Sequence, residues 1–241
     1  MKAFILAAGN GERLRPLTDT IPKCLVPVQG VPLMAIWLEL CRCHGIDEVL
    51  VNMHSHQNAI RDFVHLHRRE LKVHLVQEER LLGSAGTLLA NRQWIGPGED
   101  FWIFYGDVLT NMDLTRMLAS HRAWGQIATM GVYKVDHPSQ CGIVSIDQYH
   151  TVQSFAEKPA HPMSNLAFSG VLAATASIFA EIPERIPVDL GFHVLPNMVG
   201  RMSAYLIREY LVDVGTPSSY RDAQLNWTGL DRSSAPRRYS C

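Results

Sequence analysis

The residues between Leu6 and Thr18 have types and spacing that suit the binding of phosphate groups. The segment reads Leu6-Ala7-Ala8-Gly9-Asn10-Gly11-Glu12-Arg13-Leu14-Arg15-Pro16-Leu17-Thr18 and follows a short apolar run. Gly9 and Gly11 allow the backbone to turn tightly and to aim N–H groups at phosphate oxygens. Arg13 and Arg15 add forked donors that match phosphate geometry. The segment therefore predicts a phosphate-binding loop.

Two common phosphate-binding motifs do not describe this loop. Leu14 stands at the third glycine position of the GxGxxG dinucleotide fingerprint, and no Gly-Lys-Ser or Gly-Lys-Thr of a P-loop follows. Alone, a GxGxR loop is also compatible with an ordinary turn. However, a second segment follows closely, Pro22-Lys23-Cys24-Leu25-Val26-Pro27-Val28-Gln29-Gly30-Val31-Pro32-Leu33. Lys23 stands between prolines in this stiff segment and offers another cation for phosphate. The alternative interpretation is that Lys23 is an ordinary surface lysine.

The elements that must position these loops alternate between strands and helices. We expect strands at Lys2–Ala7, Glu48–Met53, Lys72–Val76 and Phe101–Tyr105, and helices at Pro32–His44, His56–Arg68, Ser84–Arg92 and Leu114–Ala123. Strands separated by helices predict βαβ units and a parallel sheet, with ligands at the carboxyl ends of the strands. Ala8–Pro16 and Gly106-Asp107 both follow such strand ends.

The pattern becomes rich in short strands after about Gly125. We expect strands at Ile127–Val135, Gly142–Ile146, Val152–Ala156, Phe168–Ala173, Ala204–Arg208 and Leu211–Val214, and helices near Gly191–Arg201 and Pro217–Asn226. The fold class is therefore α/β: a Rossmann-like mixed, mostly parallel sheet flanked by helices, with a β-rich lid or acceptor region and no β-helix domain. We predict one domain over 1–227, with halves 1–124 and 125–227, and a flexible tail over 228–241.

Composition excludes several classes of protein. The chain has 241 residues, is 47% hydrophobic and carries a formal net charge of -1. The apolar fraction is ample for a core, and a near-neutral charge argues against a nucleic-acid binder. No apolar run approaches the ~20 residues that span a bilayer. The five cysteines have no regular spacing, which indicates reduced thiols and a cytoplasmic protein.

The histidines invite a metal hypothesis that their spacing does not favour. The chain has 11 histidines, among them His54, His56, His65 and His67. Metal pairs on a helix favour i,i+4 spacing, whereas His65 and His67 are two apart and point in different directions. We therefore interpret them as residues of a solvated helix and its entry loop.

The two N-terminal segments together resemble the signature of the sugar-1-phosphate nucleotidyltransferases. The run LAAGNGERLRPLT followed by PKCLVPVQGVPL matches the family's glycines, arginine, lysine and prolines over about thirty residues. The resemblance implies the reaction of an NTP with a sugar 1-phosphate, which gives an NDP-sugar and pyrophosphate, with Mg²⁺ as cofactor. It also implies that Arg13 and Lys23 are the catalytic cations.

Further motifs of that family follow in the same order, as far as Asp222. They are Glu79–Leu88, Phe104-Tyr105-Gly106-Asp107, Cys141–Val144, Phe155-Ala156-Glu157-Lys158-Pro159 and Asp213-Val214-Gly215-Thr216-Pro217. The resemblance implies nucleotide contacts by Leu6, Ala8, Gly9, Gly11, Arg13, Glu78, Gly83, Ser84, Ala85, Gly86 and Asp107. It implies sugar-phosphate contacts by Gly142, Glu157, Lys158 and Gly170, and metal binding by Asp107 and Asp213.

Structural alternatives exist for several of these residues. Asp107 would also serve as a helix N-cap before the helix expected near residue 114. Asp213 precedes Gly215-Thr216-Pro217, which would also make a turn and a helix start. Glu157 and Lys158 would also make a surface ion pair. The retention of all these residues in family order favours the functional interpretation.

The identity of the substrates depends on two further segments. Leu82-Gly83-Ser84-Ala85-Gly86-Thr87 looks most like the LGTAG loops of mannose-1-phosphate and heptose-1-phosphate guanylyltransferases, which implies GTP. Phe168-Ser169-Gly170-Val171-Leu172 departs from the family's NAGIY segment and leaves open a less polar sugar. The alternatives for the nucleotide are dTTP, UTP and CTP, and the alternative for the sugar phosphate is another phosphorylated acceptor. A further alternative is that the chain is a catalytically silent regulatory subunit. The expected partners are therefore an NTP and a sugar 1-phosphate, not nucleic acid or membrane, with a homodimer as a further hypothesis.

Overall fold

The computed structural model describes residues 1–67 and 71–230. The expected helix end at Arg68 and the expected tail beyond residue 230 lie outside the described residues. The chain divides into two compact units, which we describe separately. The first unit consists of Met1–Leu81, Phe104–Asp113 and the chain from Glu209 on. The second unit consists of Leu82–Ile103 and Leu114–Arg208. The division predicted near residue 124 stays a prediction.

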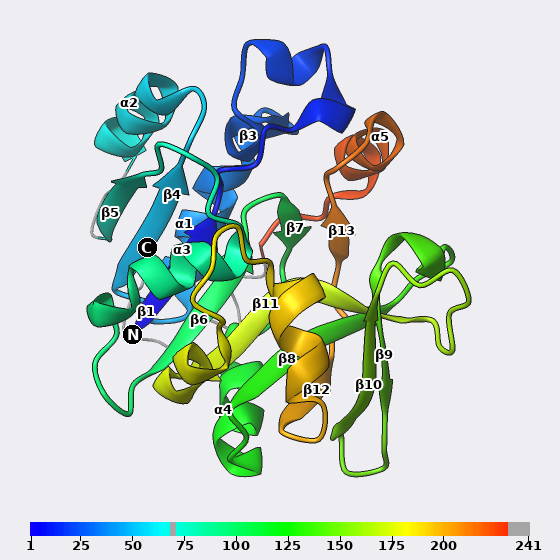
Figure 1. The fold of residues 1–241 in the computed structure, drawn as a ribbon. Coiled ribbons are helices and arrows are strands. Elements are labelled where there is room, and N and C mark those ends of the chain that lie inside the picture. The colour runs from blue at the N-terminus through cyan, green and yellow to red at the C-terminus, as the bar shows by residue number, and fades with distance from the viewer. Residues whose placement is uncertain (68–70, 231–241) are drawn as a thin grey trace. The chain divides into compact units, whose positions relative to one another are not determined.

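The first unit contains a parallel sheet that matches the expected alternation of strands and helices. Strands β1 (Lys2–Leu6), β4 (Glu48–Met53) and β5 (Lys72–Gln77) pair in parallel, with β4 in the middle. Helix α2 (Gln57–His67) connects β4 to β5 and lies beside them (Figure 1). The last residues of β6 (Asp100–Tyr105) belong to this unit and lie next to β1. The carboxyl ends of β1, β4 and β6 therefore border the expected phosphate loop.

Helix α1 (Leu33–Cys43) is buried around most of its circumference, and only a narrow stripe of Ala35, Glu39 and Arg42 is partly exposed. The buried residues include Leu33, Ile36, Trp37, Leu40 and Cys41. The Trp37 ring stacks on Phe104 with 4.4 Å between centroids, and its Nε1–H donates to the Val108 carbonyl at 2.8 Å. This bond fixes the chain directly after β6, where the candidate metal ligand Asp107 lies.

Smaller elements complete the first unit. Strands β2 (Pro27–Val28) and β3 (Val31–Pro32) form a hairpin, and β7 (Val108–Thr110) pairs antiparallel with β13 (Leu211–Asp213). Helix α5 (Pro217–Asn226) has the predicted bounds and begins with a capping box between Thr216 and Ser219. Their apolar side chains share one core: Leu14, Val28, Leu33, Ile36, Leu109, Val214 and Ala223. This core joins the phosphate loop to α1, β7 and α5.

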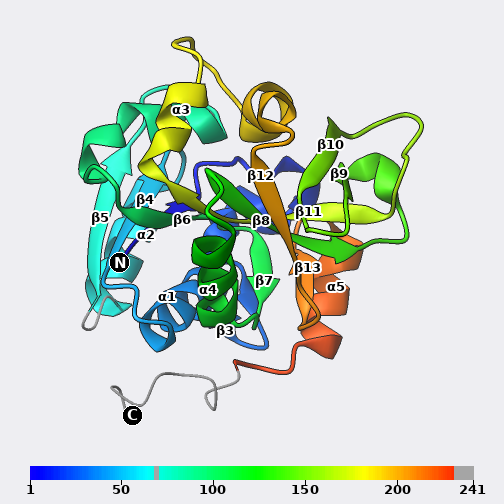
Figure 2. The ribbon, with the colours of Figure 1, turned by 90° about the horizontal axis from the view of Figure 1, so that it is seen from below.

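The second unit contains a mixed sheet. Strands β9 (Gly142–Ile146) and β10 (Val152–Glu157) form an antiparallel hairpin beside β11 (Leu166–Thr175) (Figures 1 and 2). Strand β8 (Ala128–Lys134) pairs antiparallel with β11 and parallel with β12 (Met202–Leu206). Helices α3 (Ser84–Ala90) and α4 (Leu114–Trp124) also belong here. Together with the first unit, this confirms the predicted Rossmann-like mixed, mostly parallel sheet flanked by helices.

The helix predicted near Gly191–Arg201 is wrong in type and extent. Leu190–Val194 forms one π-helical turn, and Leu195–Met198 forms a 3₁₀ turn. Pro196 has no N–H to continue an α-helix, and Gly191 has a low helix propensity. The Asp189 side chain accepts a hydrogen bond from the Phe192 N–H and fixes the start of the turn. In the described part of the chain, no helix is long and apolar enough to cross a membrane.

We expect Leu33→Ala to destabilise the chain by about 2–5 kcal/mol, because Leu33 is fully buried in the shared core. Leu225→Ala is the matched control, since Leu225 on α5 is 74% exposed and its loss should change stability by less than about 0.5 kcal/mol. Urea unfolding curves measure both. Equal, small effects of the two substitutions would contradict the assignment of this core.

Candidate active site

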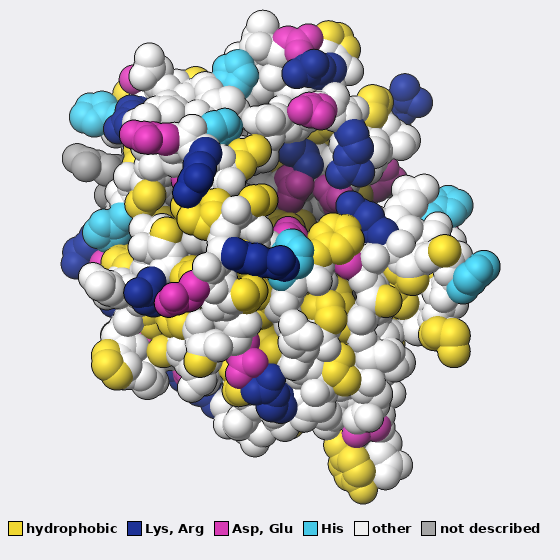
Figure 3. All heavy atoms as spheres, in the orientation of Figure 1, with side chains coloured by type: hydrophobic (Ala, Val, Ile, Leu, Met, Phe, Trp, Pro, Cys, Tyr) yellow, Lys and Arg dark blue, Asp and Glu magenta, His cyan; other side chains and the backbone are white. Residues whose placement is uncertain are grey.

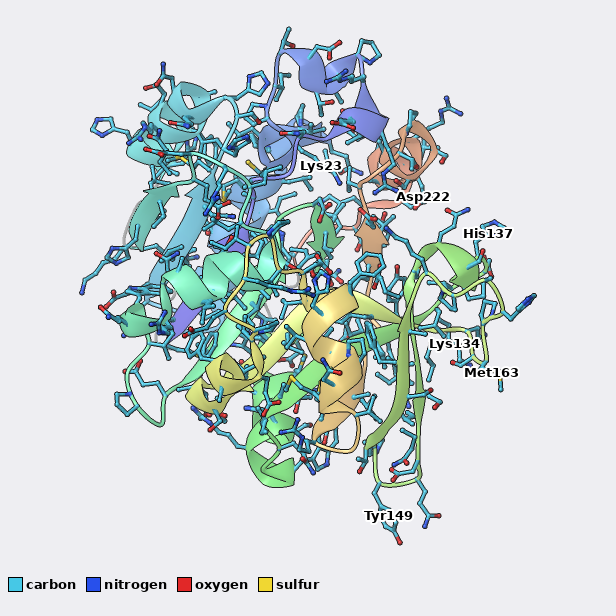
Figure 4. All side chains as sticks on the ribbon, viewed as in Figure 1. Lys23, Lys134, His137, Tyr149, Met163 and Asp222 are labelled. Atoms are coloured by element: carbon cyan, nitrogen blue, oxygen red, sulfur yellow. The ribbon has the colours of Figure 1, made fainter. Side chains whose placement is uncertain are left out.

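One ammonium and two carboxylates lie together in the first unit. Lys23 Nζ lies 2.5 Å from Asp107 Oδ2 and 3.8 Å from Asp213 Oδ1. The Lys23 side chain is only 11% exposed, whereas those of Asp107 and Asp213 are 30% and 50% exposed. Figure 4 labels Lys23 close to the loop that follows β1. The structure thus brings together three residues that the sequence places 84 and more positions apart.

Backbone pairing of β7 with β13 brings the two carboxylates together. Asp213 lies opposite Val108 in the register, and the Val214 N–H donates to the Asp107 carbonyl at 2.9 Å. The Gly106 N–H donates to the Leu6 carbonyl at 2.9 Å, and this bond fixes the residue that precedes Asp107 to the end of β1. Because β7 follows Asp107 directly, the alternative of a helix N-cap is wrong for this residue.

Gly11 connects the phosphate loop to Lys23. Its φ is +67°, and a Cβ at this position would lie 2.9 Å from Thr18 Cγ2 and 3.2 Å from Lys23 Cβ. The Thr18 hydroxyl donates to the Gly11 carbonyl at 2.7 Å. Gly9 differs, because its φ is not positive and a Cβ there would meet no described atom within 4 Å. Gly11 is therefore required by the fold of the loop, while Gly9 leaves space open above it.

Arg13 and Asp213 meet at Gly215. A Cβ on Gly215 would lie 2.8 Å from Asp213 Oδ1 and 3.1 Å from Arg13 Nη2. A larger residue at position 215 would therefore require the Asp213 carboxylate or the Arg13 guanidinium to shift. Figure 3 shows basic and acidic side chains side by side on this face, between the places that β3 and α5 occupy in Figure 1. The predicted catalytic cations Arg13 and Lys23 thus both lie beside Asp213.

A buried pair that the sequence analysis missed holds the start of the loop. Asn52 Oδ1 accepts from the Ala7 N–H at 2.7 Å, and Asn52 Nδ2 donates to Glu78 Oε1 at 2.8 Å. Both side chains belong to residues that are 4% exposed. Glu78 therefore supports the loop through Asn52, and its predicted nucleotide contact stays a prediction. A lone amide at the end of an apolar strand is the signal that would have identified Asn52.

In the second unit, the Glu157 carboxylate lies between two glycines. A Cβ on Gly142 or on Gly191 would lie 2.6 Å from Glu157 Oε2. Gly142 is the direct partner of Glu157 in the β9–β10 register. Within the described residues, none donates a hydrogen bond to this carboxylate. Burial raises the pKa of Glu157 and the nearby Asp189 raises it further, while Lys158 lowers it. Such a carboxylate is free to accept hydrogen bonds from a ligand.

Lys158 continues this cluster in an uncommon backbone conformation. Its φ is +49°, and its N–H donates to the Cys141 carbonyl at 2.9 Å. Its ammonium lies 4.0 Å from Glu157 Oε1 and is 56% exposed, so the pair is loose. A mere surface ion pair would therefore contribute little to stability. The exposed ammonium offers its donors to an anion.

The Leu82–Thr87 loop uses several of its donors inside the protein. The N–H groups of Ala85 and Gly86 both donate to the Val188 carbonyl, at 3.0 and 3.1 Å. The Ser84 hydroxyl donates to Asp189 Oδ2 at 2.9 Å. Gly83 has a φ of +80°, and a Cβ there would overlap the backbone of Val188. The nucleotide contacts predicted for this loop stay predictions, and two of its N–H groups already have partners.

The Phe168–Leu172 segment surrounds a β-bulge. The register between β11 and β8 shifts between Phe168 and Leu172, and Gly170 in the bulge has a φ of +77°. Phe168 packs edge-to-face with Phe155, with 6.4 Å between ring centroids. Leu172 is fully buried. The replacement of the family's aromatic residue by Leu172 is therefore a matter of core packing, and the sugar-phosphate contact predicted for Gly170 stays a prediction.

We expect Glu157→Gln to change how stability depends on pH. Because the pKa of Glu157 is raised in the folded protein, its contribution to stability is present below the unfolded value near 4.5 and is lost as the pH rises through the folded pKa. Glutamine does not ionise, so the variant does not lose stability at this position as the pH rises. Its free energy of unfolding should therefore increase relative to that of the parent as the pH rises. Urea unfolding at a series of pH values measures the difference.

Glu181→Gln is the matched control with the opposite sign. The pKa of Glu181 is lowered by its hydrogen bonds with Arg201, so its contribution appears as the pH rises and is lost as the pH falls through the folded pKa. This variant should lose stability relative to the parent at higher pH. Identical pH profiles for the parent and Glu157→Gln would contradict the placement of the Glu157 carboxylate.

Known proteins resemble this chain in sequence and in fold. The family model described as nucleotidyl transferase matches residues 2–229. Mannose-1-phosphate guanylyltransferase 1 of Arabidopsis thaliana is 32% identical over 91% of this chain, which spans 63% of that relative's length. A UTP–glucose-1-phosphate uridylyltransferase of Synechocystis is 33% identical over 83% of this chain and 55% of its own length. The structure of HddC from Yersinia pseudotuberculosis, 23% identical, superposes with a TM-score of 0.80 over 93% of this chain and 98% of that one. As the resemblance of its N-terminal segments predicts, the chain belongs to the nucleotidyl transferase family.

Proposed function

We propose that the chain transfers a nucleotidyl group from GTP to a sugar 1-phosphate of the mannose or heptose type, which gives a GDP-sugar and pyrophosphate. The observation that carries this proposal is the cluster of Lys23, Asp107 and Asp213 beside Arg13. Relatives that are about a third identical are named mannose-1-phosphate guanylyltransferases, and the chain spans about three fifths of their length.

The reaction needs positioned charge more than a protein nucleophile. An oxygen of the sugar phosphate attacks the α-phosphorus in line, the bond from that phosphorus to the bridging oxygen breaks, and pyrophosphate leaves with the electron pair. Negative charge grows on the leaving oxygens, which Arg13 and Lys23 stabilise. The acceptor phosphate is already ionised, so no general base is required. Lys23 suits this role because its ammonium is held in place by Asp107 at 2.5 Å.

Asp107 and Asp213 fit a magnesium ion by their chemistry. Mg²⁺ prefers hard oxygen ligands and in phosphoryl-transfer sites is bound through one or two carboxylates together with phosphates and water. Both carboxylates are partly exposed and lie beside the same ammonium. When bound there, Mg²⁺ would neutralise charge on the triphosphate. We therefore propose these two residues as its protein ligands.

Glu157 and Lys158 suit the acceptor. The carboxylate has no donor among the described residues and is partly buried, so hydroxyl groups of a sugar would satisfy it. The exposed Lys158 ammonium would bind the acceptor phosphate. Gly142 and Gly191 leave the space in which the carboxylate lies.

The choice of base has one specific alternative. The Leu82–Thr87 segment resembles guanylyltransferase loops, and several relatives carry that name. The uridylyltransferase relative is equally similar in sequence and supports UTP. Initial rates of pyrophosphate release with GTP and with UTP, each against mannose and glucose 1-phosphates, separate the two.

The cysteines support a reducing compartment. Cys24 and Cys41 are buried and free, and burial raises the pKa of Cys24 to about 12. A thiol of this kind stays protonated and unreactive. We accordingly propose a cytoplasmic location.

We expect Lys23→Ala and Asp107→Asn each to reduce turnover by at least about 10²-fold, because the first removes a cation proposed to stabilise the triphosphate and the second removes a proposed ligand of the metal ion. Lys72→Ala is the matched control, since Lys72 is 72% exposed on β5 of the same unit. Pyrophosphate release measures turnover, and thermal unfolding reports whether each variant folds. A folded Lys23→Ala or Asp107→Asn variant with near-parental turnover would remove that residue from the mechanism.

A further inference from the structure

Two consecutive residues of the π-helical turn lie against the two residues of the candidate acceptor pair. A Cβ on Gly191 would be 2.6 Å from Glu157 Oε2, and the Phe192 ring centroid lies 5.9 Å from Lys158 Nζ. All four residues belong to the second unit. The phosphate chemistry alone assigns no role to Phe192. Its position beside both charged groups makes it a candidate part of the site.

The backbone of Phe192 is fixed by Asp189 without any ligand. The Phe192 N–H donates to Asp189 Oδ1 at 3.0 Å, and the His193 N–H donates to the Asp189 carbonyl at 3.0 Å. His193 Nδ1 in turn accepts from the Asp189 N–H at 2.9 Å, and Ser84 donates to the same carboxylate. Single π-helical turns occur often at functional sites. These hydrogen bonds therefore fix the position of the Phe192 backbone, from which the side chain extends.

The Phe192 ring is exposed although it is large and apolar. It is 55% exposed, so it is not packed in the hydrophobic core. Single exposed apolar residues are common, and Tyr149 is another, 72% exposed and labelled in Figure 4 at the far tip of the β9–β10 hairpin. What distinguishes Phe192 is its neighbour, because the Lys158 ammonium lies within the range of a cation–π interaction.

We propose that Phe192 is a specificity-determining residue of the acceptor site, and that its ring packs against the apolar C–H face of the sugar ring. A pyranose carries hydroxyl groups on its rim and C–H groups on its faces. Glu157 would bind the rim, Lys158 the phosphate and Phe192 a face, which is the mixture of apolar and polar contacts that ligand sites use. This inference rests on the proposed function, because it assumes a sugar 1-phosphate as acceptor.

The first test is a set of substitutions at one position. Phe192→Ala should raise the KM for mannose 1-phosphate about tenfold and leave the KM for the NTP unchanged, because only the acceptor contacts the ring. Phe192→Tyr keeps the ring and should restore most of the affinity. Tyr149→Ala removes another exposed aromatic residue of the same unit and should change neither KM. Thermal unfolding confirms that each variant is folded.

Inorganic phosphate separates stacking on the sugar from an effect through Lys158. Phosphate has no sugar ring, so its inhibition constant against the acceptor should be the same for the parent and Phe192→Ala. An inhibition constant that rises as much as the KM would show that Phe192 acts only through Lys158 and would overturn the proposal. An unchanged KM for mannose 1-phosphate in Phe192→Ala would overturn it as well.

Calorimetric binding separates failure of this inference from failure of the proposed function. A folded parent protein that neither binds nor turns over mannose, glucose or heptose 1-phosphate would overturn both. A parent protein that binds mannose 1-phosphate, with Phe192→Ala binding equally well, would overturn only the role of Phe192. Weaker binding by Phe192→Ala with restoration by Phe192→Tyr is the expected result.

Discussion

The contact of the Lys23 ammonium with Asp107 and Asp213 is the interaction around which the candidate site of the first unit is arranged. Two carboxylates brought together by strand pairing repel each other, and the mostly buried ammonium offsets that repulsion. The pairing of β7 with β13, the hydrogen bond from Gly106 to Leu6 and the packing of Gly11 on Lys23 all serve to place these charges. The proposed nucleotidyl transfer would use the same arrangement, with the cations binding phosphate and the carboxylates binding a metal ion.

In the second unit, the Glu157 carboxylate lowers the stability of the folded chain when it is ionised. Glu157 is partly buried without a hydrogen-bond donor among the described residues, and burial together with Asp189 raises its pKa. A folded chain alone gains nothing from such a carboxylate. Gly142 and Gly191 preserve the space around it, and the adjacent Lys158, whose φ is positive, has a side chain that is more than half exposed. These features are understandable if a ligand completes the hydrogen bonds.

Local patterns predicted the regular elements well and the long-range contacts poorly. The bounds of β9 and α5 are those expected, because alternation in one case and a Thr-Pro start with a capping box in the other are local signals. The π-helical turn at Leu190–Val194 was not predicted, since Gly191 and Pro196 interrupt the helical pattern that surrounds them. Asn52 and the Ser84–Asp189 pair were missed because their partners are 45 and 105 residues away in sequence. Family resemblance, by contrast, predicted Lys23, Asp107 and Asp213 as site residues but did not show that they lie in contact.

A double-mutant cycle on turnover tests most directly whether these charges act as one unit. Rates of pyrophosphate release are compared for the parent, Lys23→Ala, Asp107→Asn and the double variant, with folding checked by thermal unfolding. Residues that act together lose their effect together, so the double variant should be about as slow as the slower single variant. A double variant whose loss equals the product of the two single losses would contradict a shared role for Lys23 and Asp107.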